Sequence, residues 1–162
     1  MSVSWVRFLV LTSLAVALSS CGTPAPEAPA GTSGSTQINA PLRIFSEDLQ
    51  SPLKTLQIKH SEQVLVPVTV RNTLQETLSS EGKYPVTLSY KWFDRGTMLG
   101  LEGERTTLPA PIKPNDSLPV RVKVMAPNTG DALVLKISLV QEGVQWFMMA
   151  GAKPLELPVT LE

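Results

Sequence analysis

The sequence predicts an all-β domain, an antiparallel β-sandwich of immunoglobulin or fibronectin III type with seven to nine strands. Apolar and polar residues alternate with period two along several short segments, and clusters rich in Gly, Pro, Asn and Asp separate these segments. No long apolar repeat of helical period interrupts them. Because the chain has a single cysteine, packing and not a disulfide must hold the two sheets together.

The clearest strand covers residues 64–71, where every even position is valine and Thr69 and Arg71 lie between. Pro67 falls on the outward face and lacks a backbone N–H, which indicates a sheet edge or a bulge. Trp92 ends another strand, where such sandwiches often bury an indole, so we expect it to be structural. The other clear strands are 86–92, 118–124, 133–139 and 155–161, and weaker ones are 42–49, 53–58, 98–101 and 145–148.

The N-terminus has the pattern of a secretory signal. Arg7 precedes an apolar run over residues 8–18, which is too short for a membrane-spanning helix of about 20 residues. Leu18, two serines and Cys21 then resemble the lipobox of bacterial lipoproteins. The resemblance implies cleavage before Cys21, a diacylglyceryl thioether on its sulfur and a further acyl chain on the new amino terminus. An ordinary cleaved signal or an uncleaved anchor remains the alternative.

Three regions follow from this pattern: a signal peptide over 1–20, a lipidated Cys21 with a tether over 21–40, and the sandwich over 41–162. The tether is rich in proline and small residues, so we expect disorder and a reach of roughly 25 Å. Gly22, and not an aspartate, follows the cysteine. The resemblance to lipoproteins therefore implies the outer membrane in a Gram-negative cell and otherwise the outer face of the cell membrane.

Charge and composition exclude several classes of function. The sequence has 14 Lys and Arg against 14 Asp and Glu, with no basic stripe, so we expect no nucleic-acid partner. His60 is the only histidine and lies in a polar turn, so no metal site, cofactor site or catalytic triad is predicted. The predicted partner of the anchor is the membrane, reached through the acyl chains on Cys21.

Three segments resemble an Ig-like accessory domain of bacterial envelope proteins, which is commonly joined to glycosyltransferases and methyltransferases of surface-sugar assembly. They read LSYKW over 88–92, EGERTTLP over 102–109 and LVQEGVQWF over 139–147. The resemblance implies an Ig-like fold and carries no activity of its own. Lys91 and Glu102 depart from the histidine and aspartate that are usual there, and 113–116 replaces the usual Pro-Gly-Glu turn.

Trp146 and Phe147 are the candidate ligand-binding residues. Successive strand residues face opposite sides, so Trp146 shares a face with Met148 and Phe147 shares one with Met149. An exposed ring could stack on a sugar, and the alternative is that both pairs pack within the sandwich. Arg105 and Glu142 lie beside glycines in the recurring motifs, and we expect them to form a structural ion pair.

The predicted function is that of a lipid-anchored, non-catalytic module for binding or assembly in the cell envelope. Its partner would be an envelope polysaccharide or another protein. Two alternatives stay open. One is a proteinase-inhibitor-like module, whose sign would be a long ordered loop over 108–114. The other is an enzyme with a cryptic hydrolytic site, whose sign would be clustered carboxylates with a perturbed pKa.

Overall fold

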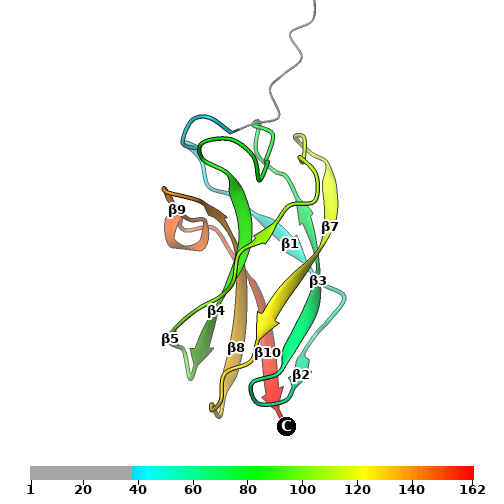
Figure 1. The fold of residues 1–162 in the computed structure, drawn as a ribbon, viewed down its shortest axis with the longest axis vertical. Helices are drawn as coiled ribbons and strands as arrows, with labels where there is room; N and C mark the ends of the chain where they lie inside the picture. The colour runs from blue at the N-terminus through cyan, green and yellow to red at the C-terminus, as the bar shows by residue number, and fades with distance from the viewer. Residues whose placement is uncertain (1–37) are drawn as a thin grey trace, which may run out of the picture. The chain divides into compact units, whose positions relative to one another are not determined.

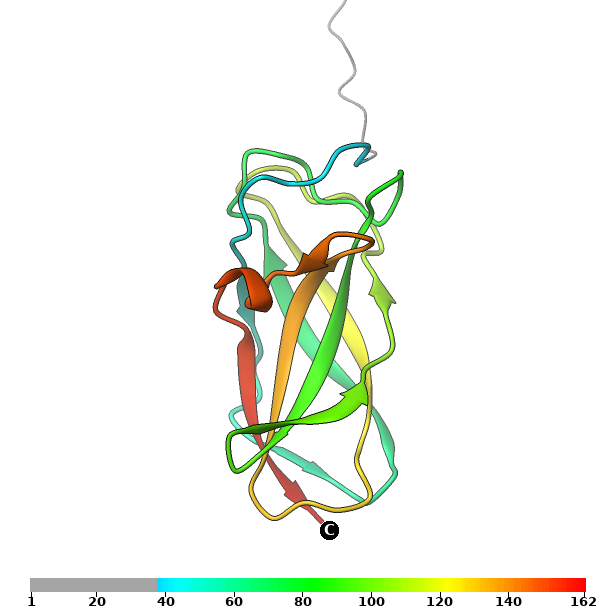
Figure 2. The same cartoon turned by 90° about the vertical axis from the view of Figure 1, so that its left-hand side faces the viewer.

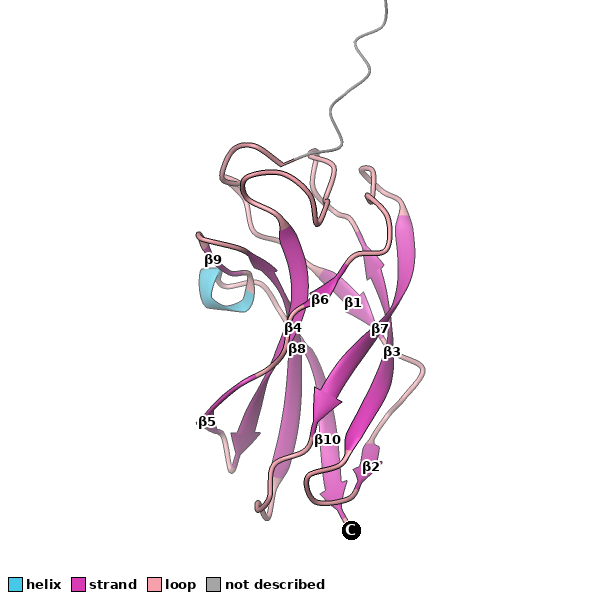
Figure 3. Cartoon of the chain, viewed as in Figure 1, coloured by secondary structure: helices cyan, strands magenta, loops and turns pink. Residues whose placement is uncertain are grey.

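The computed structural model describes residues 38–162, which form two β-sheets packed face to face (Figures 1 and 3). The predicted signal peptide over 1–20, Cys21 and residues 22–37 lie outside the described residues. One sheet has the strand order β1-β3-β7, and the other β2-β10-β8-β4-β5, with β6 beside β4 and β9 beside β8. The elements are β1 (Asp48–Gln50), β2 (Leu56–Ile58), β3 (Gln63–Arg71), β4 (Val86–Asp94), β5 (Thr97–Glu102), β6 (Thr106–Thr107), β7 (Ser117–Met125), β8 (Leu133–Gln141), β9 (Gln145–Trp146), the 3₁₀ helix η1 (Met148–Ala150) and β10 (Leu155–Leu161).

The four long strands carry the core. β3 and β7 pair antiparallel in continuous register, from Gln63 opposite Met125 to Arg71 opposite Ser117. β4 and β8 pair in the same way in the other sheet. Alternate residues of all four strands point inward, as their sequence pattern predicts, and their burial is the main stabilising contribution. The buried inward residues are Val66, Val68, Val70, Val86, Leu88, Tyr90, Trp92, Val120, Val122, Val124, Leu133, Leu135, Ile137 and Leu139.

The arrangement confirms an all-β sandwich of immunoglobulin type. Ten strands are described, counting the two-residue β6 and β9, against seven to nine expected. All pairs are antiparallel except β2 and β10, which run parallel. The first strand region is divided, because β1 pairs with β3 in one sheet and β2 with β10 in the other. Both are shorter than the expected segments 42–49 and 53–58.

Pro67 lies where β3 becomes a sheet edge. β1 ends at Gln50, opposite Thr69, so no strand lies beside Pro67 on that side. The carbonyl of Pro67 accepts a hydrogen bond from Ser51 Oγ at 2.8 Å on the same side, which is where its missing N–H would point. The register with β7 is continuous through Pro67, so the expected edge is present and the alternative bulge is not.

The two ends of the sandwich carry different parts of the chain (Figure 2). Ile38 is buried at one end, where its backbone bonds to Glu81 and Tyr84, so the packed domain includes a residue expected in the tether. Glu162 lies at the other end, where its N–H donates to Ile58. The nine-residue strands between the ends span about 26 Å at about 3.3 Å per residue.

Candidate functional site

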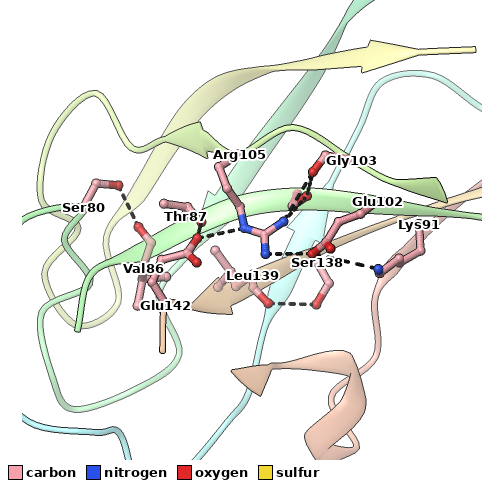
Figure 4. Close-up of polar contacts among 11 residues, drawn as sticks. Ser80, Val86, Thr87, Lys91, Glu102, Gly103, Arg105, Ser138, Leu139 and Glu142 are labelled. Carbon is pink, nitrogen blue, oxygen red and sulfur yellow. Dashed lines mark hydrogen bonds and ion pairs between the residues drawn. The ribbon is translucent and has the colours of Figure 1, made fainter. Parts of the chain in front are cut away.

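Arg105 joins three segments on the outer face of the β4-containing sheet (Figure 4). Its Nε donates to Glu142 Oε1 at 2.9 Å, which is the contact expected from the sequence. Its Nη2 donates to Glu102 Oε1, also at 2.9 Å. Its Nη1 donates to Ser89 Oγ at 3.2 Å and to the carbonyl of Gly103 at 3.3 Å. The guanidinium therefore fixes the end of β5 and the segment that follows it against β4 and against the β8–β9 turn.

Two further groups complete this network. Thr87 Oγ1 donates to Glu142 Oε1 at 2.6 Å, and Lys91 Nζ lies 4.0 Å from Glu102 Oε1. The hydrogen bond from Arg105 and then the charge of Lys91 lower the pKa of Glu102 below its ordinary value, so Glu102 is ionised at neutral pH. We call Lys91, Glu102, Arg105 and Glu142 the Arg105 cluster.

Trp146 lies against the cations of the Arg105 cluster. Its ring centroid is 4.9 Å from Lys91 Nζ and 5.1 Å from Arg105 Cζ, both within the range of cation–π attraction. The side chain is partly buried. Neither contact was expected from the sequence. The alternation of residues in a strand predicts which face a side chain lies on, but it does not predict which neighbouring side chains the Trp146 ring contacts. Two cations therefore already engage the ring on which a sugar was expected to stack.

Phe147 is not a ligand-binding residue, and this corrects the sequence prediction. It is fully buried, and its ring makes an edge-to-face contact with Phe45, with centroids 5.1 Å apart. β9 ends at Trp146 and a 3₁₀ helix begins at Met148, so the alternation expected over 145–148 covers only the first residues. Met149 is exposed on that helix, and it does not share the buried face of Phe147.

A cleft of about 300 Å³ opens between β5 and the end of β7. Tyr90 and Trp92 form its floor, and Leu101 and Met125 stand at its sides. The two aromatic side chains are 4% and 1% exposed, whereas Leu101 and Met125 are 51% and 45% exposed. The burial of Trp92 agrees with its expected structural role. The cleft combines a rigid aromatic floor with two large apolar side chains that water surrounds.

The polar atoms of the cleft floor are already used. Met125 donates its N–H to Tyr90 Oη at 2.9 Å and accepts from Trp92 Nε1 at 3.0 Å. Both groups belong to the backbone of edge strand β7, which the aromatic tips thereby satisfy. The rings consequently present only carbon to the cleft.

The rim of the cleft carries two polar groups with spare hydrogen-bonding capacity. Glu102 Oε1 is held by Arg105, and its Oε2 has no hydrogen-bond partner among the described residues. Asn128 Oδ1 accepts from Ser61 Oγ, and its Nδ2 likewise has no partner within residues 38–162. Both residues line the cleft, and the carboxylate of Glu102 is turned toward Lys91 and Arg105. The sequence did not predict this site, because its residues come from four separate segments.

Glu47 fills a gap in the sheet that the sequence gave no reason to expect. β10 pairs with β8 up to Ile137, and β9 resumes the pairing at Val140. Between these points the Glu47 carboxylate accepts from Leu139 N at 2.7 Å and from Ser138 Oγ at 2.9 Å. Burial outweighs these bonds and raises the pKa of Glu47 to about 7.

The remaining candidate features are the single histidine, metal-binding groups and membrane-spanning helices. The exposed His60 has its Nδ1 2.7 Å from the carbonyl of Asn128. Within residues 38–162 there is no group of three or more His, Cys, Asp or Glu side chains suited to a metal ion. No helix in that part of the chain is long and apolar enough to cross a membrane.

The loop over 108–114 is tied down at both ends. Leu108 and Ile112 are buried, and Ile112 exchanges two backbone hydrogen bonds with Leu78, at 2.8 and 3.0 Å. Residues 109–111 are exposed between these anchors. Lys113 is exposed as well, but Ile112 holds the middle of the loop against Leu78, so the loop does not protrude over its whole expected length.

No protein-family model matches the sequence, and no curated protein matches it either. Among solved structures it is similar to a CARDB domain from Pyrococcus furiosus in complex with di-metal ions, at 12% identity and a TM-score of 0.35. That match covers 75% of this chain and 100% of the domain. It is also similar to a β-glucosidase from Listeria innocua in complex with glucose, at 11% identity and a TM-score of 0.34, over 70% of this chain and 16% of the enzyme.

Proposed function

We propose that this chain is a lipid-anchored protein of the bacterial cell envelope whose Ig-like domain is a non-catalytic binding module. The observation that carries the proposal is the placement of two features on one domain. The chain enters the sandwich at Ile38, downstream of Cys21, and the cleft beside Asn128 lies toward the other end. An anchor joined to the first end leaves the second accessible to a partner.

The charges near the cleft support binding without catalysis. The carboxylates of Glu102 and Glu142 are both paired with Arg105, which holds the two side chains in place. The carboxyl whose pKa is raised, Glu47, receives the N–H of Leu139 and closes a gap in a sheet. A general acid needs a reacting group within hydrogen-bond reach, and here the backbone occupies that position.

The experiment that tests the anchor is the substitution Cys21→Ser in the full chain, expressed in a bacterial host. The unsubstituted protein is expected in the membrane fraction, with an N-terminal peptide whose mass includes acyl groups. The Cys21→Ser variant is expected to lose both the acyl mass and the membrane association. Ser20→Ala is the matched control, because it keeps a small residue before the cysteine and should leave both unchanged.

Two results would contradict the proposal that the protein is anchored through lipid on Cys21. Recovery of the unsubstituted protein in the soluble fraction with an unmodified Cys21 thiol would make the segment an ordinary signal. Membrane association that survives Cys21→Ser, with the signal uncleaved, would make it an uncleaved anchor. Mass spectrometry of the N-terminal peptide separates the two.

A further inference from the structure

We propose that β5 is an association edge through which two copies of this chain pair, β5 against β5, in an antiparallel register centred on Gly100. The pairing needs neither the lipid anchor nor a ligand in the cleft, so its failure would leave the function proposed above standing.

β5 is the least protected of the four sheet edges in the described part of the chain. These edges are β1 and β7 in one sheet and β2 and β5 in the other. β1 and β2 have three residues each, and very short strands are one way in which proteins blunt an edge. β5 has six residues without proline, lysine or arginine, and it lies at the margin of the domain (Figure 1). Natural proteins usually block an exposed edge that no partner covers, so this edge indicates a partner.

β7, the other long edge, is blocked. The N–H and C=O of Met125 point away from β3, and Tyr90 and Trp92 engage both groups. Backbone groups of alternate residues point the same way, so the free side of β7 also includes Pro119, which has no N–H to donate. A strand added to β7 would therefore meet a missing donor and two occupied groups.

The backbone groups of β5 are free on the side away from β4. Asp94 and Thr97 close the two-residue turn between the strands, and such a closing pair exchanges both of its hydrogen bonds. The next residue, Met98, therefore points its N–H and C=O away from β4. Near the other end Gly103 donates its N–H to β4, so Glu102 before it points its backbone groups outward as well. No described residue outside the two strands bonds to the backbone of either Met98 or Glu102.

A bulge opens the middle of β5. Met98 lies opposite Phe93 and Glu102 opposite Lys91, so residues 99–101 lie opposite a single residue of β4. Such a bulge bends the longer strand and leaves its extra residues unpaired. A Cβ at Gly100 would have no atom within 4 Å beyond its chain neighbours, so no other part of the domain covers this point.

The sequence of β5 is complementary to itself about Gly100. In an antiparallel pair centred there, Met98 lies opposite Glu102 of the second copy, and such a pair can exchange two hydrogen bonds. Leu99 lies opposite Leu101 of the second copy on the other face. The two Gly100 residues meet at the centre, where the absence of side chains allows close approach. Glu102 is the one ionisable residue of β5 and faces a methionine, so no like charges meet.

The apolar residues of β5 supply the driving force for this pairing. Leu99 packs against the core, and Leu101 lies on the same face and lines the cleft. Met98 and Leu101 are 47% and 51% exposed, so a second strand would remove apolar surface from water. One short strand from each copy makes a small interface, so the dimer is expected to be weak, with a dissociation constant of about 0.1–1 mM.

The test is an NMR dilution series of the mature chain, residues 21–162, with Cys21→Ser so that no lipid or detergent is present. The concentration runs from about 1 mM to about 20 µM, which brackets the expected dissociation constant. The backbone amide signals of Met98, Gly100 and Glu102 are expected to shift on dilution, whereas those of β7 should stay in place. Sedimentation velocity over the same range should show the change from dimer to monomer.

Charged residues at the centre of the pair test its register. Gly100→Glu and Gly100→Lys each place two like charges opposite one another and should weaken association about fivefold or more. An equimolar mixture of the two variants should associate at least as tightly as the unsubstituted chain, because opposite charges then meet. The fold should persist, since no atom crowds the Cβ position, and near-ultraviolet circular dichroism checks this. Met149→Glu and Met149→Lys are the matched controls, because they place the same charges on the exposed surface of η1 and should leave association unchanged.

Three outcomes would overturn the proposal. A single monomeric species at every concentration is one. Association that neither Gly100 variant weakens is another, because the contact would then lie elsewhere on the domain. The third is a mixture of the two Gly100 variants that associates no better than either variant alone, which would exclude a register with Gly100 opposite Gly100.

Discussion

Glu47 accepts the backbone N–H of Leu139 at 2.7 Å and thereby takes the place of a strand residue between β10 and β9. The contact ties the segment that leads into β1 to the centre of the opposite sheet. Phe45, two residues earlier, packs against Phe147 on the same surface. The entry segment is therefore held in part by an ionisable group, so the stability of the domain should depend on pH.

Glu47→Gln should remove a pH dependence of stability. Because the folded-state pKa of about 7 is above the ordinary value of 4.5, the folded state binds more protons between these values. The stabilising contribution is present below about pH 4.5 and is lost as pH rises through about 7. Urea unfolding should show the unsubstituted protein losing up to about 3 kcal/mol across this window, and less where solvent screens the group.

The Gln variant should lack this loss, because its neutral amide can still accept from Leu139 N. Glu81→Gln, at an exposed position, is the control and should keep the pH profile of the unsubstituted protein. Parallel profiles for the unsubstituted protein and Glu47→Gln would contradict the assignment of the titration to Glu47.

Tyr90→Phe should destabilise the domain by about 1–2 kcal/mol, because the N–H of Met125 loses its acceptor. The ring and its packing remain, so the change isolates the hydroxyl. Tyr84→Phe is the matched control, since the Tyr84 hydroxyl has no hydrogen-bond partner among the described residues. Chemical denaturation measures both variants, and equal effects would show that the bond to Met125 contributes nothing.

A double-mutant cycle with Arg105→Gln and Glu142→Gln should give a coupling energy of about 1 kcal/mol. The two side chains are 32% exposed each, and the carboxylate oxygen also receives Thr87. The comparison cycle is Arg95 with Asp131, whose side chains are 70% and 75% exposed. Its coupling should be below about 0.5 kcal/mol, as is usual for surface pairs. Equal couplings in the two cycles would refute a special role for Arg105.

Gly103→Ala should be destabilising by about 1–3 kcal/mol and should displace the Tyr90 ring. A Cβ at Gly103 would lie 2.5 Å from Tyr90 Cδ1, and the backbone of Gly103 is held by Ser89 and Arg105. Gly100→Ala, on the same strand region, has open space around its Cβ position and should be near neutral. A thermal melt of the two variants side by side is sufficient to decide this.

Phe147→Ala should cost about 3–5 kcal/mol, since it opens a cavity beside Phe45. Met149→Ala, two residues later and 54% exposed, should change stability by less than about 0.5 kcal/mol. The unfolding midpoints of the two variants report the difference. A small effect at Phe147 would restore it as a surface residue and contradict its burial.

The sequence was sufficient to predict the long strands, because their period-two pattern extends over enough residues to fix which face is buried. It also predicted the contact of Arg105 with Glu142 and the burial of Trp92. It did not predict that Phe147 is buried, because a 3₁₀ helix begins one residue later and ends the alternation of inward and outward residues. Short elements have too few residues for their period to be read.

The cleft and the role of Glu47 could not be predicted for a different reason. The cleft is assembled from β4, β5, the end of β7 and two loops, whose proximity depends on how the sheets pack. Glu47 looks like a surface carboxylate, since it lies before a three-residue strand with no repeating pattern around it. Its burial follows from the gap between β9 and β10, which is a property of the folded sheet.

The division of the first strand region between the two sheets has a mechanical consequence. A pull applied through Ile38 along the strand axis loads the bonds of the entry segment first, including the one from Leu139 to Glu47. It then reaches β1, where three residues are paired with β3 and would be loaded in shear. β2, bonded to β10 in the other sheet, would be loaded only after β1 yields. Shear breaks several bonds together, so the force needed is set by a high barrier to unfolding. The domain is therefore expected to resist a pull through its N-terminal end until these paired segments separate.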